Sequence, residues 1–177
     1  MNLPTVKIRR STFERIKLTV GKIPAEQGGI LLGNRDGNDR EKFVIEDFVF
    51  DNEAKTSAGT YTFNHEFLNR ILKAAYPNFQ LVGYLHSHPP RCRELSLPDR
   101  RYFSEQFKYI ETEKFITPIV ISEADTGRFE FIPYITHRDD PFNPEMGFLE
   151  IIEDESEAKK KVTDFSRINE AVCVPRS

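Results

Sequence analysis

Hydrophobic and polar residues follow one another along the chain in patterns that predict an alternation of helices and strands. Apolar residues at helical spacing begin in Ser11-Thr-Phe-Glu14, which has the spacing of a capping box, and they predict a helix over residues 12–20. Residues 28–33 form an apolar run bounded by glycines, which predicts a buried strand. Turn-forming residues 34–39 separate it from a second strand at 42–50, so we expect an antiparallel hairpin.

The middle of the chain continues to alternate between strand and helix. A short strand is expected at 60–63, and Asn64 then caps a helix whose apolar face ends before Pro77. The remaining elements are a strand at 80–86, a proline-rich loop at 89–95, a helix at 97–110, and strands at 115–122 and 128–136 joined by a turn at 125–127. This order predicts an α/β fold, and no internal repeat is visible.

The C-terminal part differs in composition from the rest of the chain. Residues 137–144 combine charges with two prolines, so we expect one domain over residues 1–137 and a linker after it. Within 138–177, apolar residues recur at steps of three and four, and they are Ala158, Val162, Phe165, Ile168 and Val172. This spacing predicts a C-terminal amphipathic helix that docks on the domain or on a partner.

Composition narrows the classes of function. With 177 residues, 38% apolar, the chain can build one domain with a short extension. The formal net charge is −3 and no long Lys/Arg tract occurs, so nucleic acid is not an expected partner. The apolar stretches are too short to span a bilayer, and no signal peptide is visible. Two cysteines, Cys92 and Cys173, form no CxxC pair, so we expect a cytoplasmic protein without a disulfide framework.

The strongest chemical signal lies between the predicted strand at 80–86 and the helix that follows. Side chains two apart on a strand point the same way, so His86 and His88 can share one ion. The loop after them lets the chain turn back, so that Asp99 can join them from the first turn of its helix. Two imidazoles, a carboxylate and a position open to water form a hydrolytic zinc arrangement. Such a site also needs a base and an oxyanion donor, for which Glu26 and Ser96 are the candidates.

Each of these residues also has an ordinary structural explanation. A His-x-His pair often occurs by chance, and Ser96-x-x-Asp99 alone is a typical capping box. An isolated Glu26 would be a surface carboxylate. A zinc nucleobase deaminase would need His-x-Glu and Pro-Cys-x-x-Cys, and neither motif is present. The joint pattern therefore favours a hydrolase.

Taken together, the motifs Glu26, His86-Ser87-His88-Pro89 and Ser96-Leu97-Pro98-Asp99 resemble the JAMM (MPN-plus) zinc metalloproteases. The resemblance covers residues 6–135, and its specific part lies between Glu26 and Asp99. It implies a mixed β-sheet packed between helices, an architecture like that of the cytidine deaminases. It also implies zinc held by His86, His88 and Asp99, Glu26 as general acid/base, and Ser96 at the oxyanion.

The chain is most similar to the small stand-alone prokaryotic members of that family. It has little room after Asp99 for the extra segment of linkage-selective deubiquitinases. The resemblance implies an isopeptidase that acts on a ubiquitin-like modifier with a C-terminal Gly-Gly, in company with E1- and E2-like enzymes. Two alternatives stay open, namely a peptidase that processes a sulfur-carrier or ubiquitin-like precursor, and a non-catalytic interaction module stabilised by zinc.

Overall fold

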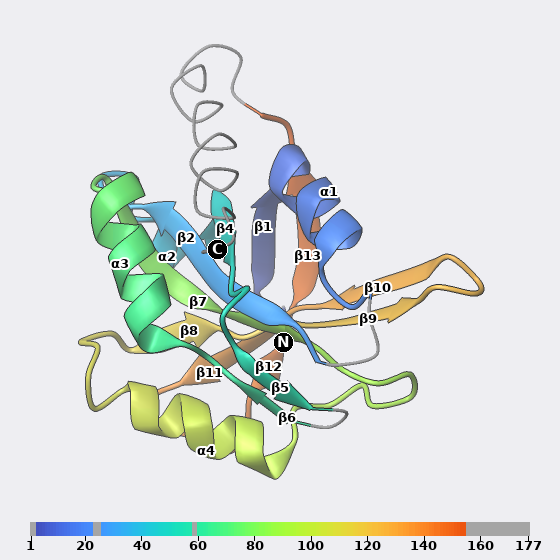
Figure 1. Ribbon diagram of the computed structural model, residues 1–177. Helices are drawn as coiled ribbons and strands as arrows, with labels where there is room; N and C mark the ends of the chain where they lie inside the picture. The colour runs from blue at the N-terminus through green and yellow to red at the C-terminus, as the bar shows by residue number, and fades with distance from the viewer. Residues whose placement is uncertain (1–2, 23–25, 58–59, 155–177) are drawn as a thin grey trace, which may run out of the picture.

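The computed structural model describes residues 3–22, 26–57 and 60–154 (Figure 1). Within these ranges the helices are α1 (Arg10–Thr19), α2 (Asp39–Lys42), α3 (His65–Ala75) and α4 (Leu97–Gln106). The strands of the first half are β1 (Thr5–Arg9), β2 (Gly28–Asn34), β3 (Val44–Ile45), β4 (Asp47–Phe50), β5 (Lys55–Ser57), β6 (Thr60–Thr62) and β7 (Phe79–Ser87). Those of the second half are β8 (Lys114–Ile116), β9 (Ile119–Glu123), β10 (Arg128–Ile132), β11 (Tyr134–His137), β12 (Glu145–Met146) and β13 (Phe148–Ile152).

The strand β7 is the centre of the main sheet. It pairs antiparallel with β2 and parallel with β8 and β9, and β2 pairs antiparallel with β4. The sheet continues from β9 to β10 and from β8 through β11 to β12. The expected hairpin between the strand at 28–33 and the one at 42–50 is therefore confirmed for β2 and β4. The sheet is mixed, and the α/β class predicted from the sequence is correct.

Two apolar clusters cover the two faces of the main sheet. One cluster joins α3 and α4 to the sheet through residues such as Phe67, Phe103 and Tyr84. The other joins α1 and the parallel three-stranded sheet β13-β1-β3 to the opposite face through residues such as Ile16 and Leu85. Figure 1 shows this division, with α3 and α4 on one side and α1, β1 and β13 on the other. The sheet is packed between helices, as the family resemblance implied.

A bulge in β7 sets the direction of the side chains that follow it. The register to β2 shifts by one residue, because Leu31 faces Gly83 whereas Leu32 faces Leu81. A Cβ on Gly83 would lie 1.8 Å from the Ile116 carbonyl oxygen, so only glycine fits there. After the bulge, Tyr84 belongs to the cluster under α3 and α4. Residues two and four positions further on then point to the same side of the sheet.

The start of α1 differs from the prediction. The helix begins at Arg10, its N-cap residue Arg9 makes no side-chain capping bond, and the expected box at Ser11 does not form. Instead, the Ser11 hydroxyl donates to the Asp154 carboxylate at 2.8 Å, and the Ser11 backbone N–H donates to it at 3.2 Å. A carboxylate at the end of β13 thus takes the place that a local cap would have filled. The capping prediction was wrong because this partner is distant in sequence.

Two predicted strands are each divided in two. The segment 115–122 separates into β8 and β9 before Pro118, and the segment 128–136 separates into β10 and β11 at Pro133. Proline has no backbone N–H to donate to a ladder, so each division falls where a proline stands. The buried hydroxyl of Thr117, between β8 and β9, lies 2.8 Å from that of Thr136 in β11, in a hydrogen bond. The divided strands let β7 pair with β8 and with β9 at different points along its length.

The chain after His137 is not a simple linker. Strand β12 pairs antiparallel with β11, and β13 pairs in parallel with β1 from Phe148 opposite Thr5 to Ile152 opposite Arg9. The half-buried side chains of Leu149 and Ile151 pack against the cluster around α1. The linker expected from residue 138 is therefore part of the fold through Ile152, because its apolar residues complete the small sheet. The predicted C-terminal helix lies outside the described residues.

The helices near the centre follow the prediction closely. Asn64 caps α3 by accepting a hydrogen bond from the Phe67 backbone N–H at 3.0 Å, as expected. The helix α4 starts at Leu97 as expected but ends at Gln106, four residues before the predicted end at 110. None of the helices within the described ranges is long and apolar enough to cross a membrane.

Candidate metal centre

The end of β7 presents two histidines to the side covered by α4. His86 is the last but one residue of β7, and His88 continues the ladder by donating its backbone N–H to the Val120 carbonyl at 2.8 Å. Their ring centroids lie 4.6 Å apart, and both side chains are buried. The expectation that His86 and His88 project in the same direction is met. The bulge at Gly83 aims both of them toward α4.

The helix α4 brings the carboxylate. Ser96 is its N-cap, and the capping box is complete, because the Ser96 hydroxyl accepts from the Asp99 backbone N–H and the Asp99 carboxylate accepts from the Ser96 backbone N–H. The Ser96 hydroxyl also lies 2.6 Å from Oδ2 of Asp99, to which it donates. The ordinary explanation of Ser96-x-x-Asp99 as a capping box is thus correct, and this cap places Asp99 over the histidines.

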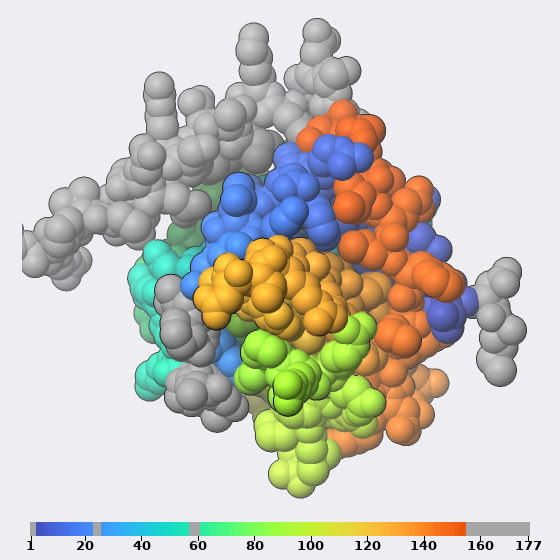
Figure 2. Space-filling model, turned by 90° about the vertical axis from the view of Figure 1, so that its right-hand side faces the viewer, coloured from blue at the N-terminus to red at the C-terminus, as the bar shows by residue number. Residues whose placement is uncertain are grey.

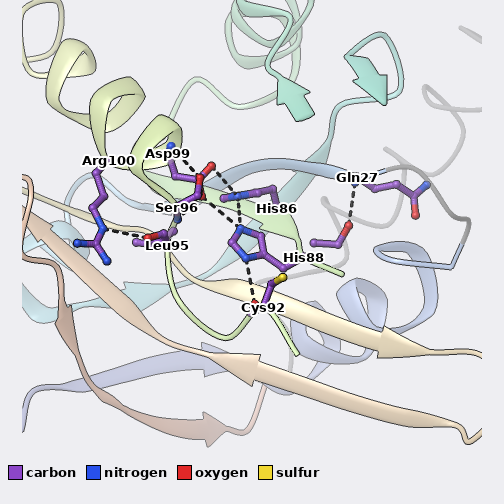
Figure 3. A network of polar contacts seen from close by, with 9 residues as sticks. Gln27, His86, His88, Cys92, Leu95, Ser96, Asp99 and Arg100 are labelled. Carbon is purple, nitrogen blue, oxygen red and sulfur yellow. Dashed lines mark hydrogen bonds and ion pairs between the residues drawn. The ribbon is translucent and has the colours of Figure 1, made fainter. Parts of the chain in front are cut away.

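The three side chains converge on one point (Figure 3). The Nε2 atoms of His86 and His88 are 2.8 Å apart, and they lie 3.1 and 3.3 Å from Oδ1 and Oδ2 of Asp99, respectively. Two ligand atoms on a tetrahedral zinc ion, with bonds of about 2.0–2.1 Å, are separated by about 3.3 Å. The two Nε2 atoms and the carboxylate oxygens of Asp99 therefore have nearly the spacing of ligands around one ion, and these three residues can form a set of metal ligands.

The remaining ring nitrogens of the histidines differ in their surroundings. Nδ1 of His88 lies 3.1 Å from the Cys92 carbonyl oxygen, to which its N–H can donate. A neutral histidine that donates from Nδ1 carries no proton on Nε2, so His88 in that form can bind a metal through Nε2, an arrangement typical of metal-binding histidines. The buried Nδ1 of His86 has no hydrogen-bond partner among the described residues. Its ring instead stacks on Tyr61 at 6.1 Å between centroids.

Glu26 lies at the same cleft, directly before β2. Its neighbour Gln27 is held to Ser87 by two hydrogen bonds, one from the Gln27 N–H to the Ser87 hydroxyl at 2.8 Å and one from the Ser87 N–H to the Gln27 carbonyl at 2.6 Å. Gln27 is labelled in Figure 3, and a dashed line marks one of its hydrogen bonds. The residue between the two histidines therefore anchors the backbone that carries Glu26.

The titratable groups influence one another strongly. Burial raises the pKa of Glu26, while the nearby His86 and His88 lower it in part. For Asp99, burial acts to raise the pKa, but hydrogen bonds from the two histidines and from Ser96 outweigh it and hold the pKa far below its ordinary value. For His88, burial lowers the pKa, and contact with Asp99 more than compensates. Asp99 is thus an anion and suits a cation beside it.

The centre opens into a cleft of about 1010 Å³. One wall is aromatic and apolar, and it consists of Tyr61, Phe63, Leu95, Pro98, Tyr102 and Phe103. The other wall is the loop after β7, which is polar and contributes Arg91, Cys92, Arg93 and Glu94. Glu26, both histidines, Ser96 and Asp99 also line this cleft. All five residues that the sequence singled out therefore meet in one place.

Sequence reasoning missed two features of the site. The first is the link from Ser87 to Gln27, which the serine between two ligand histidines could have suggested. The second is the aromatic wall, where Phe63 and Tyr102 stack at 5.1 Å between centroids and the Tyr102 hydroxyl lies 2.9 Å from Nε2 of His65. No sequence signal pointed to this wall, because its residues come from β6 and the residue after it, from the end of the loop after β7, and from α4.

Comparison with known proteins places the chain in a family. Residues 16–137, more than half of the chain, match the family model described as prokaryotic homologs of the JAB domain. The chain belongs to the prokaryotic JAB-domain family. The resemblance drawn from the motifs is thereby confirmed at the level of the family. No curated protein matches the chain.

Two solved structures were compared with this chain. The solution structure of protein DSY2949 from Desulfitobacterium hafniense superposes with a TM-score of 0.61 at 17% identity, over 85% of this chain and 95% of that one. A JAB1/MPN domain protein from Archaeoglobus fulgidus, AF2198, has a TM-score of 0.46 at 18% identity, over 84% of this chain and 100% of that one. At such identities the first of these similarities concerns the fold alone.

Proposed function

We propose that this JAB-domain protein is a zinc-dependent isopeptidase that hydrolyses the bond after the C-terminal glycine of a ubiquitin-like modifier. The proposal rests on one observation. The side chains of Glu26, His86, His88 and Asp99 line the same cleft. JAB-domain proteins include metalloisopeptidases, so the family is compatible with this activity. A carboxylate beside a metal-binding triad is the equipment of a hydrolase, because hydrolysis needs a base at the reacting water.

Zinc is the proposed metal. Two imidazole nitrogens and one carboxylate oxygen, with room in the cleft for water, match catalytic zinc sites that keep one position open. When bound, zinc supplies a Lewis acid that polarises the carbonyl and makes water nucleophilic near neutral pH.

The side chains of the protein carry out the proton transfers. Glu26 accepts a proton from the attacking water, whose oxygen bonds to the glycine carbonyl carbon. When the carbon–nitrogen bond breaks, Glu26 returns that proton to the leaving lysine amine, so one water is consumed for each bond cut. The raised pKa of Glu26 suits this exchange, because a base with a pKa closer to neutrality can both take and give a proton.

The hydrogen bond of the Ser96 hydroxyl limits the roles that this residue can have. Its hydroxyl donates to Asp99, so its proton already has an acceptor. We assign Ser96 the positioning of Asp99. The oxyanion role implied by the family resemblance stays a prediction, since it requires the hydroxyl to exchange Asp99 for the substrate oxygen.

The form of the cleft supports a slender substrate. A metal centre between an aromatic wall and a polar loop admits an extended chain more easily than a folded surface, and glycines allow the closest approach. The proposed partners are therefore a ubiquitin-like or sulfur-carrier protein that ends in Gly-Gly, its conjugates, and the E1- and E2-like enzymes that would form them in the cytoplasm.

The test is Glu26→Gln, measured for zinc content and for cleavage of a lysine-linked ubiquitin-like conjugate. We expect one zinc per chain in both proteins and a loss of turnover by about 10²–10⁴-fold in the variant, because only the base is removed. His88→Ala should lose zinc and turnover together. Equal turnover of Glu26→Gln and the parent protein would contradict the assignment of Glu26 as the base.

A paired substrate experiment separates the alternatives. The isopeptidase proposal predicts faster cleavage of the lysine-linked conjugate than of a linear fusion after Gly-Gly. The reverse preference would favour a peptidase that processes a precursor. Binding of a partner that survives in Glu26→Gln, with no cleavage by the parent protein, would favour a non-catalytic module.

A further inference from the structure

The loop after β7 contains a tight turn with an unexpected residue. The Cys92 backbone N–H donates to the Pro89 carbonyl at 3.1 Å, Pro90 occupies the second position, and Arg91 in the third has a φ of 77°. Proline followed by a residue with positive φ is the pattern of a type II turn. Glycine is favoured in the third position, because a side chain meets steric resistance there.

The turn itself has a clear purpose, but it does not require an arginine. The carbonyl at its end, that of Cys92, lies 3.1 Å from Nδ1 of His88 and so helps to orient a metal-binding residue. Glycine in place of Arg91 would form the same turn without the steric resistance. The presence of arginine therefore needs an explanation in what its side chain does.

The Arg91 side chain is exposed at the boundary between two hollows. It lines the metal cleft and also a neighbouring groove of about 780 Å³ between the loop and the hairpin of β9 and β10. Figure 2 shows the loop, in green, beside the hairpin, in gold. A protein chain that leaves the metal cleft on this side would pass Arg91.

Among the described residues, Arg91 differs from the other arginines of the groove in having no acidic partner. Arg93 and Arg128 both form ion pairs with Glu130, and Arg128 also pairs with Glu123, so two carboxylates compensate the two charges. Glu94, the acidic residue closest to Arg91 in sequence, lines the same cleft but forms no ion pair with it in the described part of the chain. A guanidinium at the mouth of the cleft is thus available for an anion.

We propose that Arg91 is a specificity-determining residue that binds a carboxylate of the protein substrate close to the scissile bond. The inference rests on the proposed function, since it places that carboxylate relative to the bond that is cut. Arginine suits the task, because its planar fork can donate two parallel hydrogen bonds to one carboxylate. The acidic residue can stand on the glycine side or on the lysine side of the bond.

The experiment uses three fluorogenic peptides with a Gly-Gly to lysine isopeptide bond. One has aspartates before the Gly-Gly, one has aspartates beside the lysine, and one has asparagines in both places. We expect the parent protein to have a KM lower by about fivefold to tenfold for one of the aspartate peptides, as for a partly exposed charge-assisted pair, with little change in kcat. The aspartate peptide with the lower KM identifies the side of the isopeptide bond on which Arg91 binds the carboxylate.

The variants are Arg91→Gly and Arg91→Gln, with Arg101→Gln as the matched control. Arg101 is an exposed residue of α4 and does not line the cleft, so Arg101→Gln removes the same charge at a site away from the cleft. Both Arg91 variants should lose the preference for aspartate, while Arg101→Gln keeps it. In addition, Arg91→Gly should melt at the same or a higher temperature than the parent protein, because the strain of the turn is removed.

The outcomes distinguish this inference from the proposed function. Cleavage by the parent protein with equal KM for aspartate and asparagine peptides, or a preference that survives in Arg91→Gly, overturns the role of Arg91 alone. A lower melting temperature of Arg91→Gly would also overturn it, since the side chain would then serve the fold. No cleavage of the peptides or of a full conjugate by the zinc-loaded parent protein overturns the proposed function, and this inference with it.

Discussion

At the scale of single residues, the site depends on contacts that hold the reactive groups from behind. Ser87 points away from the metal ligands on either side of it and binds Gln27 through two hydrogen bonds. Because Gln27 follows Glu26 directly, these bonds fix the backbone from which the carboxylate extends. Displacement of a catalytic group by even a fraction of an ångström weakens catalysis, so Ser87 would be a positioning residue in the proposed mechanism.

We expect Ser87→Ala to lower kcat by about tenfold while zinc content stays the same, because the carboxylate of Glu26 would be less well placed. Ser87→Thr retains the hydroxyl and should restore most of the rate. Thr136→Val is the matched control, since it removes a buried hydroxyl away from the cleft. A similar fall in kcat for both Ser87→Ala and Thr136→Val would show that the loss is one of general stability.

The residues of the site were predicted from the sequence, whereas their supporting contacts were not. Histidines two apart on a strand and an aspartate in the first turn of a helix follow local rules, so His86, His88 and Asp99 could be chosen in advance. The contacts of Ser87 with Gln27 and of Ser11 with Asp154 join segments that are distant in sequence. Local patterns can single out a residue such as Ser87, but they do not identify its distant partner.

At the scale of elements, α4 combines structural and chemical tasks at its first turn. Ser96 caps the helix and binds Asp99, whose other oxygen faces His86. The cap satisfies backbone N–H groups that the helix leaves without partners. The same bonds restrict the carboxylate to the position where it meets the histidines.

We expect Ser96→Ala to lower the free energy of unfolding by about 1 kcal/mol through loss of the cap. It should also weaken zinc affinity by about tenfold, because Asp99 loses a hydrogen bond that orients it. Asn64→Ala removes the cap of α3 and serves as the control. A loss of stability in both variants but of zinc affinity in Ser96→Ala alone is the expected result, and equal zinc affinities would disprove the orienting role.

The order of elements followed from periodicity, but the details of the strands did not. The prolines at 118 and 133 were visible in the sequence, yet the strands were predicted to run through them. The bulge at Gly83 was also missed, because a single glycine within an apolar strand does not show how that strand is aligned with its neighbour. The bulge nevertheless decides the face on which both histidines lie.

At the scale of the whole molecule, the C-terminal strand closes the fold. Strand β13 lies beside β1, and Arg10 at the start of α1 donates to the Glu153 carboxylate at 2.6 Å. The family model matches residues 16–137 and so includes neither β1 nor β13. These two strands lie outside the matched range and cover one face of the main sheet.

We expect a chain that ends at His137 to lose cooperative unfolding, since the half-buried Leu149 and Ile151 would no longer cover the apolar residues of β1. The cost is several kcal/mol for the apolar area exposed, a large share of the stability of an ordinary domain. Circular dichroism during heating is the measurement. A chain that ends at Asp154 retains every described strand and is the reference, and equal melting of the two would contradict the prediction.

Metal binding should also be visible in the stability of the whole protein. Zinc that binds the folded chain alone raises the melting temperature, and at concentrations well above its dissociation constant the shift is about 5 °C or more. A chelator should reverse the shift in the parent protein and in Glu26→Gln, which retains the three ligands. Absence of any shift in the parent protein would contradict a metal site at His86, His88 and Asp99.

The pairing of β1 with β13 has a consequence for synthesis on the ribosome. Thr5 cannot find Phe148 until nearly the whole chain has emerged, although all residues of the metal centre have been made by position 99. Contacts between such distant parts of a chain form slowly. The nascent protein should thus pass through a stage in which the half that contains the candidate metal centre is complete, while one apolar face of the main sheet is still exposed to chaperones.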